Sequence, residues 1–130
     1  MAHVLVVDDH ADSREVMAAM LATAGHSSVL AADGDEALSL LKREAFDLAL
    51  VDIYLPLRDG IEVIREMRRD FPAIKIVAVS AGWGPVTQPG REPYCDLQVL
   101  KRARESGAQG ALPKPLAREA LLALVEGLTE

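Results

Sequence analysis

The chain has 130 residues, 50% of them hydrophobic and 26% charged, and its formal net charge at pH 7 is −6. One soluble globular domain accounts for this length, and the composition argues against a disordered chain. The acidic balance argues against a nucleic-acid-binding surface and against an anionic-membrane binder, because both need clustered basic residues. The single cysteine excludes an internal disulfide, and no apolar run is long enough to span a membrane. No basic leader precedes the first apolar run, so we expect a cytoplasmic protein.

Short, continuously apolar runs alternate along the chain with segments of helical periodicity. Apolar runs that do not alternate with polar residues are typical of parallel strands buried on both faces. They predict strands at 4–7, 28–31, 48–51, 74–79 and 110–112. Periodicity, Asp-Gly turns and glycines in C-cap positions predict helices at 13–24, 35–44, 59–69, 93–106 and 116–127. In the first helix, the predicted inward stripe consists of Val16, Met17, Met20 and Leu21.

Five strand–helix units with short connections predict an α/β fold, an open parallel sheet covered by helices on both faces. The strand count favours the flavodoxin-like order 2-1-3-4-5, in which ligands bind at the carboxyl ends of the strands near the switch point between strands 1 and 3. We predict a single domain over 1–130, with its core at 3–127 and a long loop rich in glycine and proline at 81–95 before the fourth helix. From this length we expect no attached output module.

Polar residues follow four of the predicted strands and should meet at one edge of the sheet. They are Asp8 and Asp9, Asp52, Ser80 and Lys114. Three crowded carboxylates repel one another unless a cation lies among them, and oxygen ligands of this kind suit Mg²⁺ or Mn²⁺. A lysine and a hydroxyl are suited to binding phosphoryl oxygens. The set therefore predicts a site for a divalent cation and a phosphoryl group.

Each residue taken singly has a simpler explanation. Asp8 and Asp9 could cap a helix, Ser80 could be an ordinary loop hydroxyl, and Lys114 could be a surface lysine. Only the whole set, each member at a strand end, favours a site. The three histidines lack metal-ligand spacing, and we expect them to be structural or exposed; they are His3, His10 and His26.

Taken in order, the motifs resemble the response-regulator receiver domain of two-component signalling, in its stand-alone, chemotaxis-regulator-like form. The motifs are Val6-Val7-Asp8-Asp9, Leu50-Val51-Asp52-Ile53-Tyr54-Leu55-Pro56, Asp59-Gly60, Val79-Ser80-Ala81 and Lys114-Pro115. The resemblance covers roughly 4–125. It implies an aspartyl-phosphate signalling domain and not an enzyme with a substrate of its own.

The resemblance also assigns the phosphoacceptor and the cation ligands. It implies that Asp52 takes a phosphoryl group from a sensor histidine kinase or a histidine phosphotransfer protein. Asp9 would bind Mg²⁺ directly, and Asp8 would help directly or through water. The Asp52 carboxylate and the backbone carbonyl of Tyr54 would complete the protein ligands.

Further roles concern the phosphoryl group after transfer. Lys114 would hold a phosphoryl oxygen, and its bond to Pro115 is a candidate cis peptide. Ser80 and Ala81 would border the phosphoryl group, with the Ser80 hydroxyl turning toward it. Output would follow through contact with another protein, whose identity the sequence does not give, and the oligomeric state stays open.

Two departures from the family pattern keep other functions open. Ala111 stands where a switch aromatic is usual, and the interval from Ser80 to Lys114 is longer than usual. The first departure favours a receiver-like binding module that is never phosphorylated. A haloacid-dehalogenase-type aspartyl-phosphate hydrolase is a weaker alternative, because Tyr54 occupies the position of that family's second aspartate.

Overall fold

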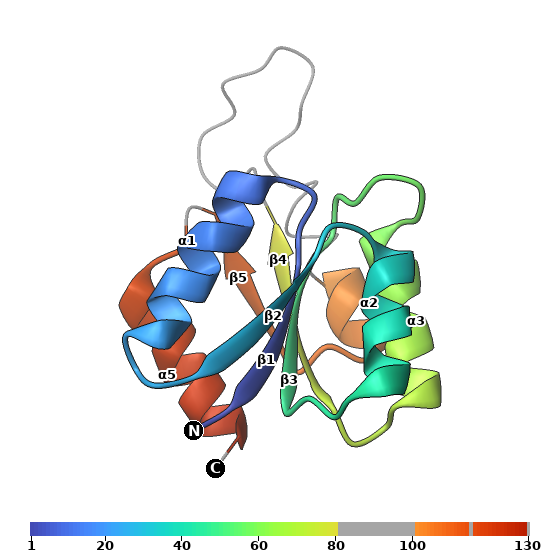
Figure 1. Cartoon of the computed structure of the whole chain (residues 1–130). Coiled ribbons are helices and arrows are strands. Elements are labelled where there is room, and N and C mark those ends of the chain that lie inside the picture. The colour runs from blue at the N-terminus through green and yellow to red at the C-terminus, as the bar shows by residue number, and fades with distance from the viewer. Residues whose placement is uncertain (81–100, 115, 130) are drawn as a thin grey trace.

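A computed structural model describes residues 1–80, 101–114 and 116–129 of the chain (Figure 1). Its strands are β1 (His3–Val7), β2 (Ser27–Ala31), β3 (Leu48–Asp52), β4 (Lys75–Ser80) and β5 (Gly110–Pro113). Its helices are α1 (Ala11–Ala22), α2 (Gly34–Arg43), α3 (Gly60–Asp70) and α5 (Arg118–Thr129), and residues 101–106 are also helical. The predicted loop at 81–95 and the first part of the predicted helix at 93–106 lie outside the described residues.

All neighbouring strands pair in parallel, in the order β2-β1-β3-β4-β5. This confirms the predicted flavodoxin-like topology. The order in which successive strands are added to the sheet reverses between β1 and β3. These two strands pair in register from Val4 with Leu48 to Val7 with Val51. The carboxyl ends of these two strands therefore lie side by side, where the sequence placed the acidic residues.

The sheet separates two apolar clusters, as expected for strands buried on both faces. On one face, alternate strand residues such as Val6, Leu50 and Val79 pack with α1 and α5. On the other face, Val51 and Ala78 belong to the cluster that packs with α2, α3 and the helical residues 101–106. Figure 1 shows α1 and α5 on one side of the sheet and α2 and α3 on the other.

Some element boundaries and one buried position differ from the sequence prediction. Helix α1 begins and ends two residues before the predicted range, and α5 begins at Arg118 instead of 116. Val16 was predicted to face inward, but it is 51% exposed, because α1 turns Met17 and Leu21 to the sheet. Strand β5 ends at Pro113, as expected for a residue without an amide hydrogen. Within the described part of the chain, no helix is long and apolar enough to cross a membrane.

Candidate functional site

The carboxyl edge of the sheet brings four predicted site residues together. Asp52 and Ser80 are the last residues of β3 and β4, and Asp8 and Lys114 directly follow β1 and β5. Asp8, Asp52 and Ser80 are buried, with exposures of 0, 3 and 0%. Parallel pairing in register places all four at the same end of the sheet. The predicted convergence is therefore present.

Lys114 is the cation of this cluster and bridges two carboxylates. Its Nζ donates to Asp8 Oδ2 at 2.5 Å and to Asp52 Oδ2 at 2.9 Å. The lysine side chain is 16% exposed, so the ion pairs are shielded from water. Its backbone N–H donates to the Ser80 carbonyl at 2.8 Å, which continues the β4–β5 pairing by one bond beyond Pro113. Lys114 is thus fixed at both its backbone and its ammonium group.

Backbone amides fix the two buried carboxylates on their other oxygens. Tyr54 N–H donates to Asp52 Oδ1 and His10 N–H donates to Asp8 Oδ1, both at 2.9 Å. In each case the donor lies two residues after the aspartate, as in an Asx turn. Arg14 Nη1 also donates to the Asp8 carbonyl at 2.7 Å. The segments that follow β1 and β3 are therefore both fixed at the site by an Asx-turn hydrogen bond.

Burial and pairing act in opposite directions on the charges at this site. Burial raises the pKa of Asp52 above its ordinary value, although the hydrogen bonds from Lys114 and Tyr54 favour the ionised form. Burial alone would lower the pKa of Lys114, but its hydrogen bonds to Asp8 and Asp52 outweigh burial and raise it. Two buried carboxylates share one ammonium group, so the site holds an excess of negative charge.

A divalent cation fits this excess charge and the donor atoms present. Asp8, Asp9 and Asp52, together with His10, each place one ligand atom within 4.8 Å of the others. Oxygen atoms this close can share one small, hard cation, directly or through waters that it retains. The exposed carboxylate of Asp9 leaves the cluster open to solvent on one side. The three aspartates predicted as Mg²⁺ ligands are thus brought together, whereas the predicted role of the Tyr54 carbonyl stays a prediction.

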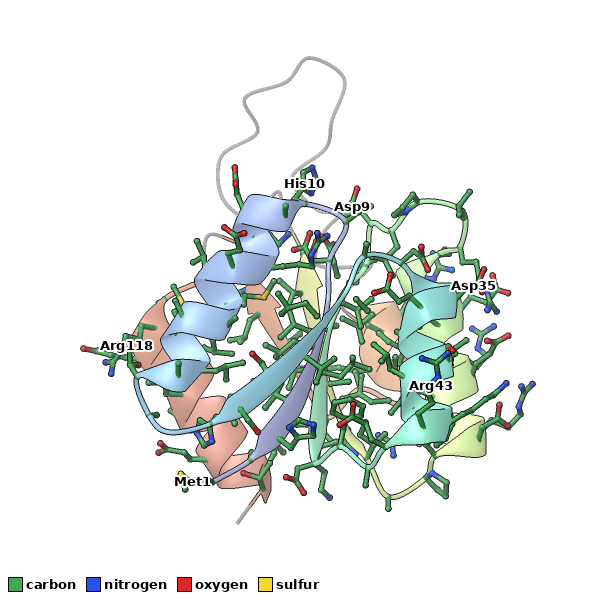
Figure 2. The ribbon with its side chains drawn as sticks, in the orientation of Figure 1. Met1, Asp9, His10, Asp35, Arg43 and Arg118 are labelled. Carbon is green, nitrogen blue, oxygen red and sulfur yellow. The ribbon has the colours of Figure 1, made fainter. Side chains whose placement is uncertain are left out.

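His10 is the member of the cluster that sequence reasoning did not include. It is exposed, as predicted, but its Nδ1 lies 3.1 Å from Asp9 Oδ1 and 3.5 Å from Asp8 Oδ1. Figure 2 shows Asp9 and His10 together at the start of α1. Its position directly after Asp8-Asp9 was the available signal, but a lone histidine matches no ligand-spacing motif.

Gly60 explains why the Asp59-Gly60 motif accompanies the site. A Cβ at Gly60 would lie 2.4 Å from the Asp52 carbonyl oxygen and 2.5 Å from Ile53 Cα. Only glycine allows α3 to begin this close to the end of β3. Asp59 caps the same helix by accepting from Ile61 N–H at 2.9 Å. The motif therefore seats α3 directly against the backbone of the predicted phosphoacceptor.

The remaining predicted residues differ in what the structure says of them. Tyr54 follows Asp52 in the loop after β3, and its side chain is half-exposed. Ala111 is partly buried in β5 and packs against the cluster on the α2–α3 face, with no aromatic ring at its position. Ala81 and Pro115 lie outside the described residues, and the predicted cis bond before Pro115 lies there too.

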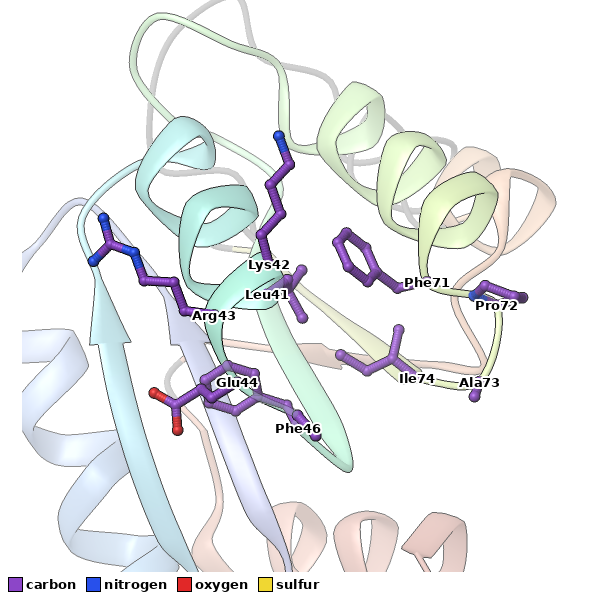
Figure 3. A pocket seen from close by; sticks show the side chains of 10 residues that line it. Leu41, Lys42, Arg43, Glu44, Phe46, Phe71, Pro72, Ala73 and Ile74 are labelled. Carbon is purple, nitrogen blue, oxygen red and sulfur yellow. The ribbon is translucent and has the colours of Figure 1, made fainter.

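A separate hollow of about 420 Å³ lies at the opposite, amino-terminal end of the sheet. Figure 3 shows Leu41, Phe71 and Ile74 facing one another across it. Its lining contains none of the clustered aspartates and not Lys114. The clustered aspartates and Lys114 therefore lie away from this hollow, whose lining includes Lys42, Arg43 and Glu44 beside its apolar side chains.

Comparison with known proteins agrees with this geometry. The family model described as response regulator receiver domain matches residues 4–89. A response regulator receiver protein of Anaeromyxobacter is 32% identical over 124 residues, which are 95% of this chain and 47% of the relative. The chain thus spans about half the length of the curated relatives it matches.

Solved structures of receivers resemble the whole chain. The receiver domain of NtrX from Brucella abortus has a TM-score of 0.84 and 26% identity, with 97% of each chain covered. Chemotaxis protein CheY4 of Vibrio cholerae has a TM-score of 0.80 and 28% identity, with 98% of each chain covered. With the sheet order, the acidic cluster and the family match in agreement, the chain belongs to the response regulator receiver domain family.

Proposed function

We propose that this receiver domain accepts a phosphoryl group on Asp52 from a phosphohistidine of a sensor kinase or phosphotransfer protein. The observation that carries the proposal is the buried Asp52 carboxylate, paired at 2.9 Å with Lys114 beside the acidic cluster. A buried aspartate used only for structure would not need two further carboxylates around it, because like charges destabilise one another.

In the proposed transfer, a carboxylate oxygen of Asp52 forms a bond to phosphorus while the bond from phosphorus to the donor imidazole nitrogen breaks. The imidazole leaves with the electron pair of the broken bond. The Tyr54 N–H holds Oδ1 and Lys114 holds Oδ2, so the carboxylate is oriented before the donor arrives. Lys114 then has a phosphoryl oxygen as an additional acceptor for its ammonium protons.

Asp8, Asp9 and Asp52 lie close enough together to hold Mg²⁺, and the family resemblance adds the backbone carbonyl of Tyr54 as a ligand. When bound, the cation neutralises charge that develops on the phosphoryl oxygens during transfer. His10 lies close enough to Asp9 to compete for the same carboxylate when its ring is protonated. The phosphoryl group adds about −1.5 to −2 charges at neutral pH, which is the physical input to any switch.

We infer that output runs through contact with another protein. The net charge of −6 supports this inference, since phosphate backbones attract basic surfaces. The stand-alone organisation stays a prediction, because the chain spans only about half the length of its curated relatives. The rival function, an unphosphorylated binding module, is favoured by one observation, the small side chain of Ala111 in β5.

Phosphorylation of Asp52 is tested by incubating the protein with acetyl phosphate, with and without Mg²⁺, and measuring its intact mass. We expect a Mg²⁺-dependent mass increase of one phosphoryl group, lost in Asp52→Asn. Asp70→Asn is the matched control, since Asp70 is an exposed aspartate that pairs with Arg69. An unmodified wild-type protein would favour the binding module, and a modified Asp52→Asn variant would remove Asp52 from this role.

A further inference from the structure

The loop from β3 to α3 contains a strained and exposed leucine. Leu57 has φ of 68°, a positive value that favours glycine. The Arg58 N–H donates to the Pro56 carbonyl at 2.7 Å, which closes a γ-turn of the rare, strained kind around Leu57. The Leu57 side chain is 89% exposed, so no burial compensates for the strain. Another interaction must hold the turn.

Arg58 provides that interaction through three carboxylates on two helices. Its Nη1 donates to Asp35 Oδ1 of α2 at 3.0 Å, and its Nη2 donates to Glu62 Oε1 of α3 at 3.3 Å and also to Glu66 of α3. The arginine side chain is 22% exposed although it lies at the surface of the fold. Figure 2 shows Asp35 at the amino-terminal end of α2. We call these four side chains the Arg58 clamp.

The clamped loop is the segment that carries the Tyr54 contacts of the acidic site. At its start, Tyr54 N–H donates to Asp52 Oδ1, and at its end Gly60 N–H donates to the Ile53 carbonyl at 2.9 Å. The ends of the loop are thus tied to the site by backbone bonds, whereas its middle is held by the clamp. The turn at Leu57 lies between these tied ends, three residues after Tyr54 and three residues before Gly60.

We propose that Arg58 is a positioning residue that holds the strained β3–α3 loop in the conformation with which the acidic site binds a divalent cation. The proposal rests on the proposed function, since it assigns that cation to the same site. Arg58 does not touch the site; it acts through the loop. Family membership does not require this arrangement, because it depends on Asp35, Glu62 and Glu66 of this particular chain.

The effect of the clamp follows from populations of the loop. If only a fraction of the molecules holds the binding-competent loop, the apparent Kd rises by the inverse of that fraction. Removing the clamp lowers the fraction of molecules with the binding-competent loop, because fewer interactions then oppose the strain at Leu57. Replacing Leu57 with glycine, which has no Cβ and adopts positive φ freely, relieves the strain and makes the clamp less necessary.

Four variants test the proposal, with Mg²⁺ binding measured by calorimetry and by amide NMR shifts. We expect Arg58→Ala to weaken Mg²⁺ binding roughly three- to tenfold, and the Leu57→Gly/Arg58→Ala double variant to bind within about twofold of wild type. Leu57→Gly alone should bind like wild type. The matched control is Arg69→Ala, which removes an exposed arginine of α3 that pairs with Asp70.

The sign of the effect separates positioning from simple electrostatics. Removing a positive charge near an acidic site makes its potential more negative and should strengthen cation binding, which is the opposite of the expected result. The Leu57 ¹³Cα and ¹³Cβ shifts report the turn itself, and they should leave left-handed values in Arg58→Ala. In a fifth variant, Arg58→Lys, the side chain can reach fewer carboxylates at once, and we expect an intermediate loss of Mg²⁺ affinity.

Wild-type Mg²⁺ binding with an unchanged affinity in Arg58→Ala would overturn this proposal and leave the proposed function intact. A double variant that binds as weakly as Arg58→Ala would also overturn it, because the strain at Leu57 would then be irrelevant. A wild-type protein that binds no Mg²⁺ would refute the cation site of the proposed function, and this proposal with it.

Discussion

Adding one methyl group at Gly60 should destabilise the fold and disturb the site together. The new Cβ of Gly60→Ala would lie 2.4 and 2.6 Å from the carbonyl oxygens of Asp52 and Ile53 and 2.5 Å from Ile53 Cα. Ordinary contacts begin near 3.4 Å, so the backbone must move by roughly 1 Å, and no flexible side chain can absorb the shift. Overpacking of this kind costs about 3 kcal/mol, against which the better helix propensity of alanine returns at most about 1 kcal/mol.

Gly127 offers the matched control, because it lies in α5 and a Cβ there meets nothing within 4 Å. We expect Gly127→Ala to gain about 0.5–1 kcal/mol and Gly60→Ala to lose about 2 kcal/mol in the free energy of unfolding. Urea unfolding followed by circular dichroism measures both. A Gly60→Ala variant as stable as wild type would refute the close approach of α3 to β3.

Two further predictions concern the buried charges. Asp52→Asn should stabilise the metal-free protein by about 1 kcal/mol at pH 7, because it removes one of two carboxylates that share Lys114. The pKa of Asp52 in the folded protein is raised above 3.8, so the gain in stability should be absent below pH 3.8 and should grow as pH rises through the folded pKa. Urea unfolding measures the stability difference between variant and wild type, and a difference that stays constant from pH 3 to 8 would contradict this. Lys114→Met should lose about 3 kcal/mol, since Asp8 and Asp52 lose their shared cation, and added Mg²⁺ should restore more stability in this variant than in wild type. Thermal unfolding with and without Mg²⁺ measures the loss of stability. The control is Lys42→Met, which changes an exposed lysine of α2. An equal loss of stability and an equal response to Mg²⁺ in both variants would count against the bridge between Lys114 and the two aspartates.

The sequence was sufficient for the topology, which the strand count favoured, and for the convergence of the acidic residues, which depends on strand ends. A continuous apolar run that ends in aspartate places that aspartate at the carboxyl edge whatever the details of packing. Asp8, Asp52 and Lys114 could therefore be assigned to one place without knowing a single contact. What the sequence did not predict is that Lys114 would pair with both aspartates at once.

The features that the sequence did not predict share a physical reason, because each depends on how elements are oriented relative to one another. Val16 and Met17 are both apolar, and only the rotation of α1 on the sheet decides which is buried. The Arg58 clamp joins residues from two helices, and its Asp35 contact spans 23 positions in the sequence. His10 joins the acidic cluster through the direction of one turn after β1. Periodicity and motif spacing carry none of this information.

The bridge between Lys114 and the two aspartates also has a consequence for the order in which the site forms during synthesis of the chain. Lys114 comes 62 residues after Asp52 and 106 residues after Asp8 in the chain. A growing chain that has already paired β1 with β3 therefore brings two carboxylates together before their ammonium partner exists. Until β5 joins the edge of the sheet, that pair lacks the ammonium group of Lys114, and cations from solution can offset its charge. Addition of the last strand and arrival of the Lys114 ammonium group are thus one event, and we expect Mg²⁺ to favour the partly folded chain.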